Sequence, residues 1–536
     1  MTSEVVYNLL ESPVSIIHSK TPMHLASHSV RVLDLTTCYV SRSPQLHSIV
    51  ILPAPEFVWV DPTFLGQFGP SIILNYSTAS LDPGNLRGGL VGALCACILG
   101  KKGHNIDVFE YRADPRSADE KLSRGKSINL ALSTRGRATL ARAGLEDLII
   151  SNGIPMKGRM LHSVTGQQKK VLYDPNGHQC IYSVSRRDLN NVLLTAAEKM
   201  PNVKLHFRHK LVSADPAKGK LQLQNREGHQ ESLIDFEANL LIGADGAHSA
   251  MRQQLLKRRR TNFSQTYIEH GYMELSMLPR PDGKHAMEKN YLHIWPRDQF
   301  MMIALPNQDG SFTVTLFMPF QNFDEISSPE DVKSFFRKEF PDALDLIGEE
   351  LLISDFLSSS PSALISIKCS PLHAQRAVLI GDAAHAMVPF YGQGMNAGFE
   401  DVLILDDLLD NWDVHGIEKC LANFTETRRE DAQAICELAM YNYTEMRHLV
   451  NQRGYYLRRL VDQVLNKVFG NGWVPLYNSV TFTRIPYSQC IQKRKWQDEI
   501  LEKMKNVFVA GTAVALVGVA LQYRSNIPFR IEYLGK

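Results

Sequence analysis

Several features that define large protein classes are missing or scarce in this sequence. Its eight cysteines are spread over 536 residues, and the nearest pair, Cys95 and Cys97, has neither zinc-binding nor redox spacing. This favours reduced thiols in a cytosol-facing protein over a disulfide framework. No basic start followed by an apolar core marks a signal peptide. The net charge is only +2, so no nucleic acid or other polyanion is expected as a partner, and the basic run 257–260 is better explained as a solvated helix end.

What remains is the composition of an ordinary globular protein. Hydrophobic residues make up 44% of the chain and charged residues 21%, which favours neither a disordered nor a fibrous chain. The length suits about two to four domains or one large two-domain enzyme. No nucleophile, metal cluster or protein triad stands out.

One long uncharged apolar run lies near the C-terminus. Residues 507–523 are flanked by Lys503, Lys505 and Arg524, and a helix of this length covers roughly 25 Å of a bilayer core about 30 Å thick. A buried core helix is the alternative. Apolar residues on every side and basic flanks favour a transmembrane tail anchor.

Part of a dinucleotide-binding unit begins at residue 88. Residues 88–101 predict a helix and residues 105–110 a strand that ends in Glu110, 18 residues beyond Gly92. Gly89 and Gly92 would let the backbone approach a pyrophosphate, and the acid would bind a ribose. The beginning of the unit is missing, because Arg87 stands where the first glycine belongs and a Pro-Gly turn at 83–84 stands where the strand belongs.

Two later segments repeat the pattern of an apolar strand that leads into a helix through a tight turn. Residues 240–242 lead to Gly-Ala-Asp-Gly at 243–246, and residues 377–380 lead to Gly-Asp at 381–382. A glycine-rich loop then precedes a helix that starts near Met395, and such a helix start offers free N–H groups to an anion.

Together these segments resemble the three sequence marks of the single-component flavoprotein aromatic hydroxylases. Stretches at 127–133, 153–156, 290–297, 381–401 and 440–447 are similar to the members that act on L-kynurenine. The resemblance implies an enzyme that uses FAD, NADPH and O₂ to hydroxylate L-kynurenine to 3-hydroxykynurenine, in tryptophan degradation and NAD biosynthesis. It also implies the mitochondrial outer membrane as the location, with the catalytic domain facing the cytosol.

The same resemblance implies an α/β (α+β) fold in which a Rossmann-like, three-layer FAD domain is assembled from separate segments. We expect an atypical segment at 1–86 that need not be ordered, the FAD domain with an inserted antiparallel substrate sheet at 87–440, a helical region at 441–500 and the anchor at 507–523.

The resemblance also assigns candidate site residues. No side chain is expected to be catalytic, because the flavin carries the chemistry. Arg159 is the expected partner of the substrate carboxylate, which its planar fork suits; the other substrate positions are Tyr173, Phe317, Pro389, Phe390, Gln393, Asn442 and Tyr477. For the cofactor the matching positions are Gly89, Gly92, Glu110, Arg112, Ala131, Arg186, Leu211, Asp245, Asp382, Met395 and Asn396.

The damaged loop has two explanations. In the first, residues 1–86 are an alternative segment joined to an otherwise intact enzyme, which would explain why the resemblance stops inside a motif. In the second, an upstream run such as 71–76 folds back into the vacant strand position. The first explanation is favoured, because a working loop needs its strand to end at the glycine. It predicts that FAD is bound weakly or not at all.

Two other functions remain open from the sequence. The Asp-Gly and Gly-Asp marks alone would suit another flavin hydroxylase or an epoxidase, against which the joint presence of Arg159, Tyr173, Asn442 and Tyr477 argues. A catalytically impaired, membrane-anchored interaction protein is supported only by the broken loop.

Overall fold

The computed structural model describes residues 38–40, 51–53, 71–75, 89–117, 129–175, 177–227, 231–448 and 453–525. The chain divides into two compact units, Met1–Asp61 and Pro62–Lys536. In the first unit, β1 (Cys38–Val40) pairs antiparallel with β2 (Ile51–Pro53). All of the site residues predicted above belong to the second unit.

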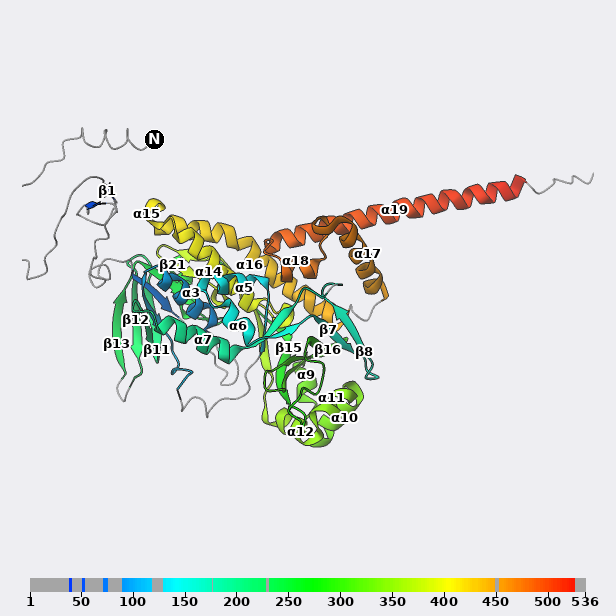
Figure 1. Ribbon diagram of the computed structural model, residues 1–536, viewed down its shortest axis with the longest axis horizontal. Helices are drawn as coiled ribbons and strands as arrows, with labels where there is room; N and C mark the ends of the chain where they lie inside the picture. The colour runs from blue at the N-terminus through cyan, green and yellow to red at the C-terminus, as the bar shows by residue number, and fades with distance from the viewer. Residues whose placement is uncertain are drawn as a thin grey trace, which may run out of the picture. The chain divides into compact units, whose positions relative to one another are not determined.

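A six-stranded sheet forms the centre of the second unit (Figure 1). Its order is β10 (Val203–His206), β4 (Asn105–Phe109), β3 (Ser71–Asn75), β14 (Leu240–Gly243), β21 (Ala377–Leu379) and β20 (His373–Ala374). The strands are parallel except for β20. Every residue of β14 and β21 is buried, as a parallel sheet covered on both faces requires. The predicted α/β class is confirmed.

The vacant strand position predicted at the start of the dinucleotide unit is filled. β3 lies between β4 and β14, with Ile72 opposite Ile106 and Leu240, and Ile72 is fully buried. The absence of a first strand, which the sequence favoured, is therefore wrong, and the upstream run supplies it. The reason is physical: two buried parallel strands with no partner between them would leave their N–H and C=O groups unpaired. Arg87 lies outside the described residues.

Helices cover this sheet. α3 (Leu90–Lys101) is buried along almost its whole length and packs against β4, α7 (Arg186–Glu198) and α14 (Gly394–Leu409). The remaining helices of this region are α5 (Thr134–Ala143), α6 (Glu146–Ser151), α8 (Ala250–Arg258), α13 (Asp382–His385) and α15 (Trp412–His415). Two small sheets flank them: β5 (Asn129–Leu132), β9 (Ile181–Ser185) and β6 (Ile154–Met156); and β11 (His209–Asp215), β12 (Lys220–Asn225) and β13 (Ser232–Glu237).

A seven-stranded, mainly antiparallel sheet lies beside the central one. Its order is β19 (Ser362–Ser370), β15 (Asn262–Met277), β18 (Phe312–Pro319), β17 (Phe300–Pro306), β16 (Tyr291–Arg297), β7 (Gly158–His162) and β8 (Gln168–Leu172). Successive residues of a strand face opposite sides of the sheet. Met302 belongs to the core that the sheet forms with four helices, α9 (Phe320–Asp324), α10 (Pro329–Glu339), α11 (Pro341–Ile347) and α12 (Glu349–Ser358). Met301, on the opposite face, belongs to a second core that includes residues of α16 (Ile417–Arg447). That second face forms one wall of the cavity described below.

Helices dominate the C-terminal region. α16 is followed by α17 (Arg453–Phe469), the short 3₁₀ turn η3 (Gly470–Gly472), α18 (Leu476–Phe482) and α19 (Tyr487–Ser525). Another 3₁₀ turn, η1 (Pro389–Tyr391), precedes α14. The predicted anchor at 507–523 lies on α19, and its last part falls outside the residues whose side chains are described. Within the described residues, no helix combines the length and the apolarity needed to cross a membrane.

Candidate active site

A cavity of about 280 Å³ lies between the central sheet, the antiparallel sheet and the loop before α14. Its lining comes from segments that are far apart in the sequence, from Gly89 at the start of α3 to Tyr477 on α18. Ten of the residues predicted from the sequence line it: Gly89, Ala131, Arg159, Arg186, Phe317, Asp382, Pro389, Phe390, Met395 and Tyr477. The fold therefore brings members of both predicted sets, cofactor and substrate, to one cavity.

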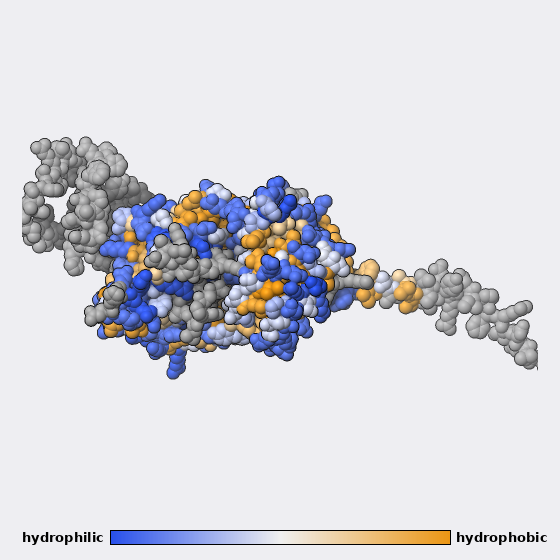
Figure 2. Space-filling model, turned by 90° about the horizontal axis from the view of Figure 1, so that it is seen from below, coloured by the Kyte–Doolittle hydropathy of each residue, from blue (hydrophilic) through white to orange (hydrophobic). Residues whose placement is uncertain are grey.

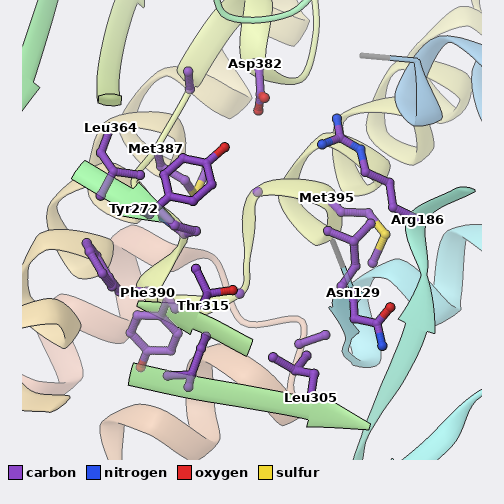
Figure 3. A pocket seen from close by; sticks show the side chains of 18 of the residues that line it. Asn129, Arg186, Tyr272, Leu305, Thr315, Leu364, Asp382, Met387, Phe390 and Met395 are labelled. Carbon is purple, nitrogen blue, oxygen red and sulfur yellow. The ribbon is translucent and has the colours of Figure 1, made fainter. Parts of the chain in front are cut away.

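The end of the cavity near the central sheet is charged. Arg186 and Asp382 are seen there in Figure 3, and both line the cavity. Burial lowers the pKa of Arg186 and raises the pKa of Asp382, while the opposite charges of the two groups counteract each shift. An arginine and an aspartate that line the same end of a cavity suit a ligand that carries both hydroxyl and anionic groups.

Two glycines allow the backbone to form this end. Gly89, the N-cap of α3, has φ 133°, and Gly381 has φ 61°, values that side chains rarely adopt. A Cβ on Gly381 would also lie 3.1 Å from Val91 Cγ2. The Gly381 turn therefore approaches the first turn of α3 closely, and the N-terminus of that helix opens onto the cavity.

Two predicted acids lie behind this end and do not line the cavity. Glu110 follows β4, is 6% exposed and accepts a hydrogen bond from the Arg112 N–H at 2.9 Å. Asp245 follows β14 and accepts hydrogen bonds from Ser249 Oγ and, at 2.9 Å, from the Met251 N–H. Burial raises the pKa of Asp245 to about 6. In this structure Asp245 thus stabilises the start of α8.

Glu110 makes the stability of the protein depend on pH. Burial raises its pKa from 4.5 to about 8, so the folded chain binds this proton more tightly than the unfolded chain. The resulting stabilisation is complete below about pH 4.5 and is lost as the pH rises toward 8. We expect the melting temperature of the apoprotein to fall over this window, and Glu110→Gln to flatten that part of the profile. An identical slope in the variant would contradict this assignment.

The other end of the cavity is aromatic around one cation. The guanidinium of Arg159 on β7 lies 4.2 Å from the ring centroid of Tyr477 and 3.8 Å from Glu445 Oε1. Tyr173 and Tyr391 each stack on Tyr477, with centroids 5.4 and 5.5 Å apart. Arg159 Nε is buried and has no hydrogen-bond partner among the described residues. A buried donor without an acceptor favours the binding of an anionic oxygen from a ligand.

Phe390 and Phe317 form a wall beside this end, with ring centroids 4.8 Å apart. Asn442 on α16, predicted to bind substrate, instead donates from Nδ2 to the Phe390 carbonyl at 2.7 Å. Tyr443 stacks on Phe390 at 3.8 Å. Both α16 residues hold the wall from behind, as a buried amide or ring commonly does.

The remaining predicted residues also lie outside the lining. They are Gly92 within α3, Arg112, Tyr173, Leu211 in the core of β11, Gln393 and Asn396. Asn396 connects segments: its Nδ2 donates to the Ala131 and Gly392 carbonyls, both at 2.8 Å, and its Oδ1 accepts from the Ser133 N–H at 2.9 Å. It fixes β5 against the glycine loop.

Sequence reasoning missed several lining residues, among them Asn129, Tyr272, Met301, Leu305, Thr315, Leu364 and Met446. Most lie on strands of the antiparallel sheet. The near-continuous apolar runs within 291–319 could have shown that each strand has two covered faces, but no local signal shows which face meets the cavity.

Comparison with known proteins defines the class of this fold and site. Residues 88–439 match the family described as FAD binding domain, and the match begins inside the loop that the sequence showed to be damaged. Among solved structures, 2-methyl-3-hydroxypyridine-5-carboxylic acid oxygenase is similar with a TM-score of 0.56 and 19% identity, covering 71% of this chain and 93% of that one. A probable FAD-dependent monooxygenase from Pseudomonas aeruginosa is similar with a TM-score of 0.56 and 17% identity, covering 72% and 99%. The fold is that of the FAD-dependent monooxygenases.

Curated relatives narrow the class. Kynurenine 3-monooxygenase of Anopheles gambiae is 53% identical over 83% of this chain and 90% of its own length. The enzymes of Sus scrofa and Caenorhabditis elegans are 48% and 44% identical, covering 80% and 81% of this chain and 89% and 95% of their own lengths. The chain belongs to the kynurenine 3-monooxygenase family, which confirms the resemblance.

Proposed function

We propose that this chain is an FAD- and NADPH-dependent monooxygenase that uses O₂ to hydroxylate L-kynurenine to 3-hydroxykynurenine. The observation that carries the proposal is the cavity itself. A glycine-bounded, charged end lies in one space with an aromatic end that presents the unpartnered Nε of Arg159. Such a cavity suits a dinucleotide cofactor beside a flat, carboxylate-bearing substrate.

The charged end fits FAD. The N-terminus of α3 at Gly89 offers N–H groups to a pyrophosphate, and the buried carboxyl group of Glu110 suits ribose hydroxyls. Arg186, Asp382 and Met395 border the space where the rest of the cofactor would lie. When bound, FAD takes a hydride from NADPH and activates O₂ for attack on the ring.

The aromatic end would position the substrate. Arg159 would pair with the α-carboxylate, and Phe317 and Phe390 would hold the ring while excluding water. Because β7 is paired on both sides, with β8 and β16, the backbone of Arg159 is fixed. The protein then contributes orientation and desolvation.

Attachment to a membrane through α19 is part of the proposal, as is the outer mitochondrial membrane with the catalytic unit facing the cytosol. Its support is a set of exposed apolar side chains on the described part of α19, seen in orange in Figure 2. Val507 and Phe508 are each 73% exposed and Leu516 is 71% exposed. Lipid would remove this apolar surface from water.

Flotation of the full chain with liposomes tests the attachment. The full chain should float with the liposomes, and a control chain truncated after residue 505 should stay at the bottom of the gradient. A full chain that also stays at the bottom would contradict the attachment.

The enzymatic proposal is tested with detergent-solubilised full chain supplied with FAD. NADPH oxidation should rise on addition of L-kynurenine, with one 3-hydroxykynurenine formed for each NADPH consumed in excess of the basal rate. A rate of NADPH oxidation that does not rise with L-kynurenine, or a rise that yields no hydroxylated product, would overturn the proposal. Equal stimulation by an aromatic acid without the amino-acid side chain would indicate a different hydroxylase.

A further inference from the structure

A buried ionic cluster behind the cavity connects the start of α19 to the loop before α14. Arg135 on α5 binds both carboxylate oxygens of Glu400 on α14, at 2.7 and 2.8 Å. Arg428 on α16 binds Glu400 at 3.2 Å and Asp401 at 2.8 Å. Side-chain exposure is at most 5% for all four groups, so each charge is held by its partners.

Tyr487, the first residue of α19, is part of this cluster. Its ring lies 3.9 Å from the guanidinium carbon of Arg135 and is fully buried. Arg135 also donates to the carbonyls of Val480, at 3.3 Å, and Ile485. The next residue, Ser488, is anchored to Asp431 on α16 through its N–H at 2.9 Å and its hydroxyl at 2.7 Å. These contacts hold the ring of Tyr487 in place beside Arg135.

The hydroxyl of Tyr487 points at Gln393, a buried residue of the loop before α14 that lies between two lining residues without itself lining the cavity. It donates to Gln393 Oε1 at 3.1 Å, and burial keeps the phenol protonated by raising its pKa. Gln393 is 2% exposed and stands between Gly392 and Gly394, which both line the cavity. No acceptor among the described residues binds its Nε2. With Oε1 held by the phenol, the amide can offer only N–H groups to a ligand.

We propose that Tyr487 is a positioning residue that fixes the amide of Gln393 so that its N–H groups donate to an acceptor oxygen of the substrate. The first turn of the C-terminal helix thereby determines part of the substrate specificity. This rests on the proposed function, since it assigns the orientation of a residue in that same site.

A double-mutant cycle tests the proposal. Tyr487→Phe keeps the ring under Arg135 and removes only the hydroxyl. We expect its dissociation constant for L-kynurenine, measured by calorimetry on the FAD-loaded chain, to rise about fivefold, the effect of one neutral hydrogen bond. FAD content should be unchanged, and the chain should remain folded. Gln393→Leu should weaken binding at least as much, and Tyr487→Phe should then add less than a twofold effect in the Gln393→Leu background. Tyr267→Phe on β15, at a ring 52% exposed, is the matched control without effect.

Additive effects in the double variant would overturn the proposal, because Tyr487 would then act without Gln393. Unchanged binding in Gln393→Leu would also overturn it, and this arm does not depend on the folding of Tyr487→Phe. If the unsubstituted chain does not bind L-kynurenine, the proposed function fails; if it binds and Tyr487→Phe binds equally well, only the positioning role fails.

Discussion

Replacing Arg159 by glutamine is expected to lower kcat/KM for L-kynurenine by about 100-fold or more while the bound FAD stays in place. Removing one partner of a buried charged hydrogen-bond pair costs roughly 3 kcal/mol or more, and every tenfold change corresponds to about 1.4 kcal/mol. Arg159 is buried, and Glu445 at 3.8 Å is too distant for a direct hydrogen bond. The substrate carboxylate would be its strongest partner, so its loss should affect substrate and not cofactor.

A substrate analogue separates this role from a structural one. The decarboxylated amine of L-kynurenine lacks the group that Arg159 would bind, so the unsubstituted chain should strongly prefer L-kynurenine over it. Arg159→Gln should lose most of that preference, and Arg159→Lys should keep part of it, because an ammonium retains the charge without the planar fork. An equal loss of kcat/KM for L-kynurenine and for its decarboxylated amine would show that Arg159 maintains the shape of the cavity and does not bind the carboxylate.

Removing β3 is expected to have the other large effect. Deleting residues 2–61, which form a separate compact unit, should leave FAD content and melting temperature unchanged. Deleting residues 2–76 should yield a flavin-free or aggregated chain, because β4 and β14 would lose the strand between them. Flavin absorbance per chain after desalting, with thermal unfolding, measures both.

A point substitution refines this test. Ile72→Asp puts a carboxylate at a fully buried position and should cost about 4 kcal/mol or more. The same change at Ile51, in the other unit, is the matched control and should have no effect on FAD content. If the chain without residues 2–76 held FAD as well as the full chain, β3 would have no role and the upstream segment would be a mere addition.

The expectation of weak FAD binding had two premises. The first premise, that the strand before the loop is missing, is wrong, because β3 (Ser71–Asn75) pairs in register with both of its neighbours, β4 and β14. The other premise, Arg87 in place of the first glycine, lies outside the described residues. With the sheet complete and the family match covering residues 88–439, we expect about one FAD per full-length chain.

Local sequence determined the family and several residues at each end of the cavity. Some features depend only on backbone geometry within a few residues, so the sequence alone predicts them. They are the glycine turns, the acid that follows β4 and the apolar strands before residues 243 and 381. Arg159, Arg186 and Asp382 follow from the resemblance carried by such segments, and the structure places all three in one cavity.

Only the tertiary structure decided the rest. The strand slot was filled by a run that ends before residue 76, because completing a buried sheet outweighs the length of the connection. Asn442 supports Phe390 from behind, and Tyr487 reaches Gln393 across 94 positions of sequence. Such contacts depend on how α16 and α19 pack against the loop before α14, and packing between distant elements leaves no periodic or local mark in a single sequence.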